Sequence, residues 1–110
     1  MTKVTYYENS DEISVEIMGH AGYAVEGSDV VCSAISMLIQ TLIAYLETDE
    51  CECKYTMRTG HVWSYAKGYD AKIAFGVIMT GFWLLSQTYP EHVSIDRGCA
   101  IQTKPSIDIT

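Results

Sequence analysis

The sequence predicts a single α/β domain over residues 1–110, with the element order ββαββαβ. Two segments are apolar on nearly all sides over the length of a long helix, and five shorter segments have the composition or the alternation of strands. With 110 residues, 48% of them hydrophobic, the chain is long enough to bury one core. Helices this apolar need cover on more than one side. We expect the two helices to pack between antiparallel sheet layers, or to bury a large surface in a dimer, or both.

The first two elements form a predicted hairpin. Residues 2–7 favour a strand by composition, and apolar side chains occupy every second position of the next strand, 12–18. The turn sequence Asn-Ser-Asp at 9–11 joins the two strands. Residues 19–27 follow with three glycines, and we expect them to form a mobile loop rather than a continued strand.

The first helix is predicted from Ser28 to about Leu46. Ser28 is a natural N-cap, and Asp29 is well placed in the first turn to complement the helix dipole. No stretch reaches the roughly 18 uninterrupted apolar residues of a membrane span, and the N-terminal residues lack the apolar region of a signal peptide. We therefore expect a cytoplasmic protein.

The second half of the chain repeats the order strand, strand, helix and adds a final strand. Its predicted elements are a strand over 51–58, a turn at Thr59-Gly60, a strand over 62–67, a helix over 71–87 and a strand over 92–96. Alternation in the first of these strands predicts a half-buried face that carries Cys51, Cys53, Tyr55 and Met57. Pro90 ends the second helix. The tail over 98–110 has weak periodicity, and we expect it to be loosely held.

The net charge and the cysteine content limit the kinds of partner and of cysteine chemistry that we expect. The 14 acidic residues outnumber the 7 basic ones, which gives a net charge of −7 with neutral histidines, and no lysine or arginine occurs between Lys3 and Lys54. We therefore expect no nucleic acid as a partner, whereas a basic protein would be attracted. The four cysteines are too few and too irregularly spaced for a disulfide framework, so we expect free thiols.

Cys32 is the first candidate for chemistry, because it lies four residues after the expected N-cap. The unpaired amides and the positive dipole end of a helix N-terminus favour the thiolate, which is the reactive form of cysteine. His20, at the end of the preceding strand, could accept the thiol proton. A cysteine inside an apolar helix is ordinarily an inert core residue, and spacing alone leaves that alternative open.

Other patterns have weaker functional interpretations. The glycine-rich loop could cradle a phosphate, but without a nearby lysine or arginine its amides are better suited to a developing oxyanion. Cys51 and Cys53 share a strand face and could bind a metal with His61 or Cys99, although their alternation indicates core packing. We expect no metal and no cofactor. His61 and His92 have no assigned partner and are expected at the surface or at an edge.

Two strings carry a more specific signal: Gly19-His-Ala-Gly-Tyr23 and Gly27-Ser-Asp-Val-Val-Cys-Ser-Ala-Ile-Ser36. They resemble the ribosomal-processing cysteine protease family Prp, whose pattern is GHA after the second strand and aspartate-X-valine-cysteine at the start of the first helix. Carried over by position, the resemblance implies that His20 and Cys32 form the catalytic dyad. Supporting or substrate-binding roles are expected for Gly19, Ala21, Gly22, Gly27, Ser28, Asp29 and Ser36.

Two of these supporting residues have alternative roles. Asp29 can orient His20 or simply complement the helix dipole. Ser36 lies one turn past Cys32 and can hydrogen-bond within the site or back to its own helix.

The resemblance further implies a homodimer with the helices between sheet layers, and a loop that orders over the substrate. The implied activity is removal of a short N-terminal extension from a large-subunit ribosomal protein, by cleavage after an apolar, Phe-ended sequence. A basic ribosomal protein would suit the acidic chain. Acidic residues such as Glu26 and Asp29 would then attract the basic segment beyond the cut.

Two other functions remain as alternatives. The chain could be a non-catalytic binding partner of the ribosomal protein precursor on a protease fold, or a small thiol-redox protein that uses Cys32. The presence of both His20 and Cys32 argues against the first, and the lack of a CxxC pair argues against the second.

Overall fold

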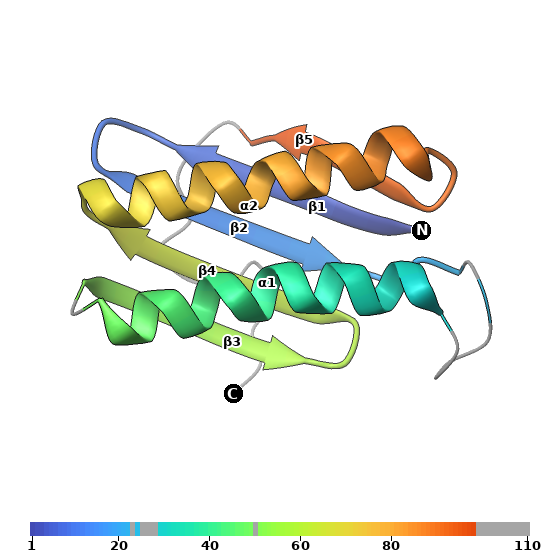
Figure 1. Cartoon of the computed structure of the whole chain (residues 1–110), viewed down its shortest axis with the longest axis horizontal. Helices are drawn as coiled ribbons and strands as arrows, with labels where there is room; N and C mark the ends of the chain where they lie inside the picture. The colour runs from blue at the N-terminus through green and yellow to red at the C-terminus, as the bar shows by residue number, and fades with distance from the viewer. Residues whose placement is uncertain (23, 25–28, 50, 99–110) are drawn as a thin grey trace.

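The computed structural model describes residues 1–22, 24, 29–49 and 51–98. Its elements are β1 (Thr2–Glu8), β2 (Glu12–Met18), α1 (Val30–Thr48), β3 (Glu52–Arg58), β4 (His61–Lys67), α2 (Tyr69–Thr88) and β5 (Val93–Arg97). The predicted α/β class and the order ββαββαβ are confirmed (Figure 1). Apart from Gly98, the residues of the predicted loose tail lie outside the described part of the chain.

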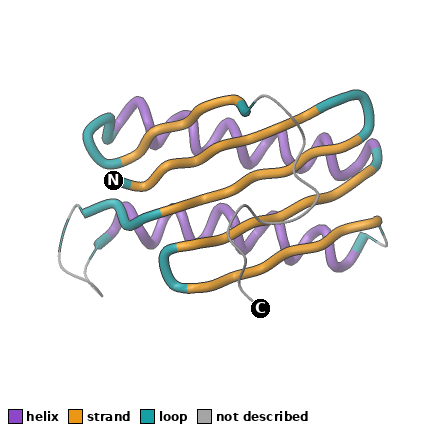
Figure 2. The backbone as a smooth tube through the Cα atoms, turned by 180° about the vertical axis from the view of Figure 1, so that it is seen from behind, coloured by secondary structure: helices purple, strands orange, loops and turns teal. Residues whose placement is uncertain are grey.

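The strands form one five-stranded sheet in the order β3-β4-β2-β1-β5, and both helices lie on the same face of it (Figure 1, Figure 2). Three of the pairs are antiparallel, whereas β5 runs parallel to β1. The parallel pair follows from the connections: β1 and β4 both run against β2, and α2 carries the chain back so that β5 repeats the direction of β4. The described residues thus supply one mixed sheet layer, on one side of the helices.

The core lies between the sheet and the two helices. Ile13, Val15 and Ile17 of β2 alternate as predicted, and all three are buried. The buried residues of the helices are Val31, Ile35, Ile39, Leu42, Ile43 and Leu46 of α1, and Ala71, Phe75, Ile78, Met79, Phe82 and Ser86 of α2. These positions recur with the period of one helix face, so each helix buries one side and leaves the other exposed.

By length and composition, α1 would also suit a membrane span. In this fold it is a core helix, because its buried face packs against the sheet and against α2. The two helices approach closely at Gly81, where an added Cβ would lie 2.7 Å from the Leu38 side chain. The apolar character of α1 therefore serves packing within the domain.

The strand β3 is an edge strand, and the half-buried face predicted for it is only partly formed. Cys53 packs against the core, while Tyr55 and Met57 are 44% and 45% exposed. The reason is its place in the sheet, since β4 is its single neighbour among the strands that the structure describes. Side chains on an edge strand have cross-strand neighbours on one side only.

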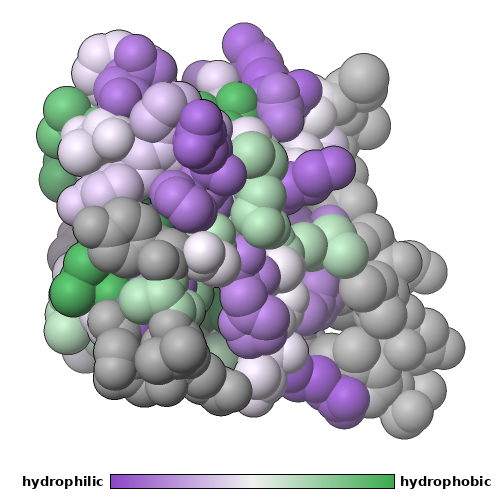
Figure 3. Space-filling view, turned by 90° about the vertical axis from the view of Figure 1, so that its right-hand side faces the viewer, coloured by the Kyte–Doolittle hydropathy of each residue, from purple (hydrophilic) through white to green (hydrophobic). Residues whose placement is uncertain are grey.

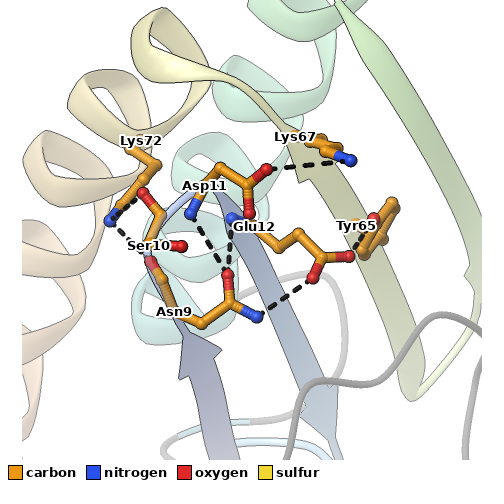
Figure 4. A network of polar contacts seen from close by, with 7 residues as sticks. All are labelled: Asn9, Ser10, Asp11, Glu12, Tyr65, Lys67 and Lys72. Atoms are coloured by element: carbon orange, nitrogen blue, oxygen red, sulfur yellow. Dashed lines mark hydrogen bonds and ion pairs between the residues drawn. The ribbon is translucent and has the colours of Figure 1, made fainter.

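A polar network ties the β1–β2 turn to β4 and α2 (Figure 4). The Asn9 side-chain oxygen accepts hydrogen bonds from the backbone N–H groups of Asp11 and Glu12, at 3.2 and 2.8 Å. The Glu12 carboxylate accepts from the Tyr65 hydroxyl, and Lys72 Nζ donates to the Asn9 carbonyl at 2.6 Å. The predicted turn is therefore closed by its own asparagine and anchored by both neighbouring elements.

Candidate active site

One end of the molecule brings together segments that are distant in sequence (Figure 1). The end of β2, the start of α1, the turn between β3 and β4 and the start of β5 all lie there. Two backbone hydrogen bonds link parts of this end: Gly19 N–H donates to the Gly60 carbonyl in the β3–β4 turn, and Thr2 N–H of β1 donates to the His92 carbonyl before β5, both at 2.9 Å. Figure 3 looks onto this end, where polar and apolar side chains both reach the surface.

His20 follows β2 and lies against the turn between β3 and β4. Gly19 has a φ of +90°, and a Cβ at that position would lie 2.5 Å from the Met1 carbonyl oxygen, so only glycine fits before His20. The imidazole is close to Gly60, since a Cβ placed on that glycine would be 3.2 Å from His20 Nε2. The His20 side chain is exposed and therefore within reach of a substrate.

Cys32 is the third residue of α1, and Asp29 is the N-cap of that helix. The Asp29 oxygen Oδ1 accepts hydrogen bonds from the N–H groups of Val31 at 2.9 Å and Cys32 at 3.0 Å. The prediction that Ser28 caps the helix is therefore wrong by one residue, because the Asp29 carboxylate satisfies two of the orphan amides. Cys32 still lies in the first turn, as predicted. Ser28 and Gly27 lie outside the described residues.

Asp29 is a buried carboxylate with a structural task. It is 6% exposed, and its second oxygen, Oδ2, accepts a hydrogen bond from the Ala24 N–H at 3.3 Å. Of the two roles left open for Asp29, capping of the helix N-terminus is the one that the structure shows. Asp29 also lines one of the cavities beside Cys32, and its attraction for a basic segment stays a prediction. Glu26 lies outside the described residues.

Ala21 contacts Cys32 and His92 through the two ends of its backbone. Its N–H donates to Cys32 Sγ over 3.4 Å, and its carbonyl oxygen lies 3.0 Å from Nδ1 of His92. Its methyl group is buried in the core. The expectation that His92 is an ordinary surface or edge residue missed this contact, because 71 positions separate the two residues and no local pattern links them.

Two cavities open beside Cys32, and His20, Cys32, Ser36 and Gln40 border both of them. The first cavity, of about 410 Å³, has an apolar part of its lining formed by Ile17, Ile35, Ile39, Met57 and Val62. The second, of about 500 Å³, extends past Gly22 along the loop side. A peptide lying across both cavities would pass over the thiol and the imidazole, which together with backbone amides are the groups that acyl transfer needs.

The family model described as cysteine protease Prp matches residues 1–94. The chain belongs to this family. The resemblance inferred from the two motif strings and the enzyme class that it implied are thereby confirmed.

The similar Prp proteins include one from Mycoplasma genitalium, named ribosomal processing cysteine protease Prp. It is 32% identical over 83 residues, which cover 72% of this chain and 82% of that protein. The essential ribosomal processing protease Prp from S. aureus, solved with a covalently linked product peptide, has a TM-score of 0.77 at 17% identity and covers 89% of this chain and 100% of its own. SMU.848 from Streptococcus mutans has a TM-score of 0.72 at 26% identity, over 88% of this chain and 93% of its own.

Two other candidate thiols of this Prp chain, Cys51 and Cys53, lie at the opposite end of α1 from Cys32. Cys51 and Cys53 both approach the Leu46 carbonyl, with Sγ–O distances of 3.4 and 3.8 Å. Burial raises the pKa of the Cys51 thiol, and the neighbouring Cys53 raises it further. Among the described residues no three potential metal ligands come together, and Cys99 lies outside them.

His61 is buried, so the expectation of a surface or edge residue is wrong. Its Nε2 lies 2.7 Å from a carboxylate oxygen of Glu16, and the two side chains are 9% and 6% exposed. The register of β2 and β4 pairs Met18 with His61 and Glu16 with Trp63, which places both polar residues on the same face of the sheet. A buried carboxylate needs such a partner, but only the strand pairing reveals which residue supplies it.

Proposed function

We propose that this chain removes the N-terminal extension of a large-subunit ribosomal protein precursor, with Cys32 as the nucleophile and His20 as general base and acid. The observation that carries the proposal is that the thiol and the imidazole border the same two cavities. The thiol lies in the first turn of α1, which Asp29 caps. The Ala21 N–H adds a donor directed at the sulfur.

The proposed reaction has two stages. His20 takes the proton of the Cys32 thiol, and the sulfur attacks the scissile carbonyl carbon, which forms a C–S bond and a tetrahedral oxyanion. Backbone amides of the loop stabilise this oxyanion, because the N–H groups of Val31 and Cys32 at the start of α1 already donate to Asp29. The C–N bond then breaks, and the departing amine takes the proton from His20. Water, deprotonated by His20, hydrolyses the thioester and restores the thiol.

The substrate class is argued from the cavity, the charge and the relatives. The apolar part of the first cavity suits an apolar side chain before the cut. The net charge of −7 suits a basic protein beyond the cut. The Mycoplasma genitalium relative is named a ribosomal processing protease, and the S. aureus Prp has also been solved with a substrate peptide. Such a reaction belongs in the cytoplasm, where ribosomes are assembled.

We also propose that the chain forms a homodimer. Apolar side chains on the helices remain 42–69% exposed, namely Met37, Tyr45, Ile73, Val77, Trp83 and Leu84. A groove of about 340 Å³ between α1 and α2 is lined by Tyr45, Ile73 and Val77 among others. A second copy laid over this surface would bury it and would place the helices between two sheets, so the dimer would supply the second layer.

The test of the protease function is to incubate the ribosomal protein precursor with the wild type and with Cys32→Ala, His20→Ala and Cys53→Ala, and to map the new N-terminus by mass spectrometry. Wild type should cut at one site after an apolar residue. Cys32→Ala should bind the precursor without cutting it, and His20→Ala should lose at least ~100-fold in rate, as expected for a missing general base.

Cys53→Ala is the matched control, since it removes a thiol outside the cavities, and it should cut like the wild type. Cleavage that survives in Cys32→Ala would exclude the mechanism. A wild type that binds the precursor and never cuts it would instead favour the non-catalytic binding partner.

A further inference from the structure

We propose that His92 is a positioning residue of the active site, which holds the Ala21 carbonyl so that the Ala21 N–H stays directed at the Cys32 sulfur. The inference rests on the proposed role of Cys32 as the nucleophile and adds a residue from the far end of the chain to it. Three observations carry it. Nδ1 of His92 lies 3.0 Å from the Ala21 carbonyl oxygen, and the Ala21 nitrogen lies 3.4 Å from Cys32 Sγ. The backbone of His92 is itself held by hydrogen bonds.

The direction of the histidine contact is set by chemistry. A carbonyl oxygen only accepts hydrogen bonds, so Nδ1 of His92 must carry the hydrogen that bonds to Ala21. The hydrogen bond made by one ring nitrogen determines the tautomer of a neutral imidazole. The geometry therefore requires the Nδ1–H tautomer of His92 whenever its ring is neutral.

The backbone of His92 is held at both of its polar groups. Its N–H donates to the Tyr89 carbonyl, and its carbonyl accepts from the Thr2 N–H, each at 2.9 Å. The next residue, Val93, begins β5 and pairs with Thr2 of β1. The imidazole is thus carried by a fixed point of the sheet edge rather than by a free loop, which is what a positioning residue needs.

Ala21, in contrast, lies in a stretch with little intrinsic rigidity. Gly19 and Gly22 flank the His20–Ala21 pair with φ values of +90° and +69°, and a Cβ on Gly22 would meet nothing within 4 Å. Glycines restrict the backbone less than any other residue. The side chain of Ala21 is held by the burial of its methyl group. The hydrogen bond from His92 holds the Ala21 carbonyl group and thereby limits rotation of the Ala21 backbone, which keeps its N–H directed at Cys32.

The consequence concerns the sulfur. A backbone N–H that points at a thiolate forms a charge-assisted hydrogen bond, which is stronger than one to a neutral thiol and therefore favours the reactive form. If His92 cannot donate, Ala21 is free to turn and the sulfur loses this donor. The loss should appear in the rate of the chemical step and leave substrate affinity unchanged.

The first experiment compares His92→Leu with His92→Asn, because these two side chains have nearly the same shape and only asparagine places a donor where Nδ1 stood. The rate of Cys32 alkylation by limiting iodoacetamide is measured by peptide mapping, and kcat and KM are measured on a peptide that spans the cleavage site. Loss of one hydrogen bond predicts a fall of about fivefold in both the alkylation rate and kcat for His92→Leu, with KM unchanged. His92→Asn should stay within about twofold of the wild type.

Glu91→Gln, at an exposed neighbour, is the control and should equal the wild type. Equal alkylation and equal kcat in His92→Leu and His92→Asn would overturn the proposal, whether both match the wild type or both fall. If the wild type cuts no peptide and the alkylation difference persists, the proposed protease function fails while the positioning role of His92 stands.

The second experiment needs no variant and so does not depend on whether His92→Leu folds. Nitrogen-15 spectra of the imidazole, recorded at a pH where the ring is neutral, report which ring nitrogen carries the hydrogen. The expected result is the Nδ1–H tautomer for His92. The Nε2–H tautomer would leave Nδ1 without a hydrogen to donate and would overturn the proposal.

Discussion

At the scale of single residues, the first turn of α1 determines what the site can do. Asp29 turns its carboxylate back onto the amides of Val31 and Cys32, and this cap fixes where the helix begins. Cys32 therefore has the third place in the helix, with its side chain beside the dipole end and its sulfur within reach of the Ala21 N–H. If α1 began one turn earlier or later, the Cys32 thiol would lie away from the helix N-terminus and from the Ala21 N–H.

Cys32 should be the most reactive thiol of the chain. It combines a helix N-terminus, a backbone donor and an opening shared with His20, whereas burial raises the pKa of the Cys51 thiol. Limiting iodoacetamide followed by peptide mapping should label Cys32 first, and the preference should weaken in His20→Ala. Faster labelling of Cys51, Cys53 or Cys99 would show that the nucleophile is assigned wrongly.

Loss of the helix cap should be visible in stability. Asp29→Ala removes the acceptor of two helical amides and of the Ala24 N–H, so the free energy of unfolding in urea should fall by about 1–2 kcal/mol. Asp29→Asn is the matched variant, since asparagine caps nearly as well, and it should fall less. Equal losses in the two variants would mean that the cap bonds do not account for the stability of this helix.

At the scale of elements, the two hairpin turns are closed in different ways. The β1–β2 turn is closed by the Asn9 side chain and tied down by Tyr65 and Lys72, whereas the β3–β4 turn depends on Gly60, with a φ of +78°. The second turn lies beside the exposed His20, where a side chain in place of hydrogen would crowd the imidazole. The polar side-chain network (Figure 4) is thus placed at the β1–β2 turn, at the end of the molecule opposite the site (Figure 1).

The hydrogen bond between Tyr65 and Glu12 should make stability depend on pH at both extremes. It lowers the pKa of Glu12 and raises the pKa of Tyr65 to about 12. Because the pKa of Glu12 is lowered in the folded state, its contribution to the free energy of unfolding is present above its unfolded pKa of about 4.3. This contribution is lost as the pH falls through the folded pKa. The raised pKa means that the Tyr65 contribution is full below about 10 and is lost as the pH rises through 12.

Tyr65→Phe should therefore be less stable than the wild type between about pH 5 and pH 9, and the difference should shrink towards both extremes. Chemical denaturation across this range measures it. Tyr69→Phe is the control, because Tyr69 is 78% exposed, and it should follow the wild type throughout. A difference that is independent of pH would mean that Tyr65 stabilises the fold through packing alone.

At the scale of the whole molecule, one sheet face carries two helices whose outer sides are not covered by the described residues (Figure 1). The helix faces that point at the sheet are covered, since Val4, Ile13 and Val15 of the sheet and Phe82 of α2 are fully buried. The outer side retains an apolar groove between α1 and α2. A surface of this kind is typical of an interface between subunits.

We predict a dimer at micromolar concentration in analytical ultracentrifugation. Val77→Glu, at a position that is 69% exposed, should leave the monomer folded and weaken the dimer, because it places a charge in the apolar surface. Gln87→Glu adds the same charge at an exposed polar position of α2 and should leave the dimer intact. A wild-type monomer, or equal effects of the two substitutions, would contradict this interface.

The sequence by itself determined the elements and the family. The alternation of Ile13, Val15 and Ile17 indicated β2, the all-round apolarity of 30–46 indicated α1, and the strings around His20 and Cys32 indicated a Prp protease. These signals are local, because the period of a strand or helix and the spacing of a motif are written in consecutive residues. The helix boundaries were less well determined by the sequence. Ser28 was predicted as the N-cap of α1 and the structure has Asp29, because adjacent polar residues are equally suited to accept from the first amides of a helix.

Only the tertiary structure decided which distant residues meet. The bond of His92 to Ala21 and the pairing of Glu16 with His61 join residues 71 and 45 positions apart. Both depend on the strand order β3-β4-β2-β1-β5, which brings β4 beside β2 and the start of β5 beside β1. The strand order depends on how the helices cover one face of the sheet. It is determined by the burial of apolar side chains over the whole core, which no short stretch of sequence encodes.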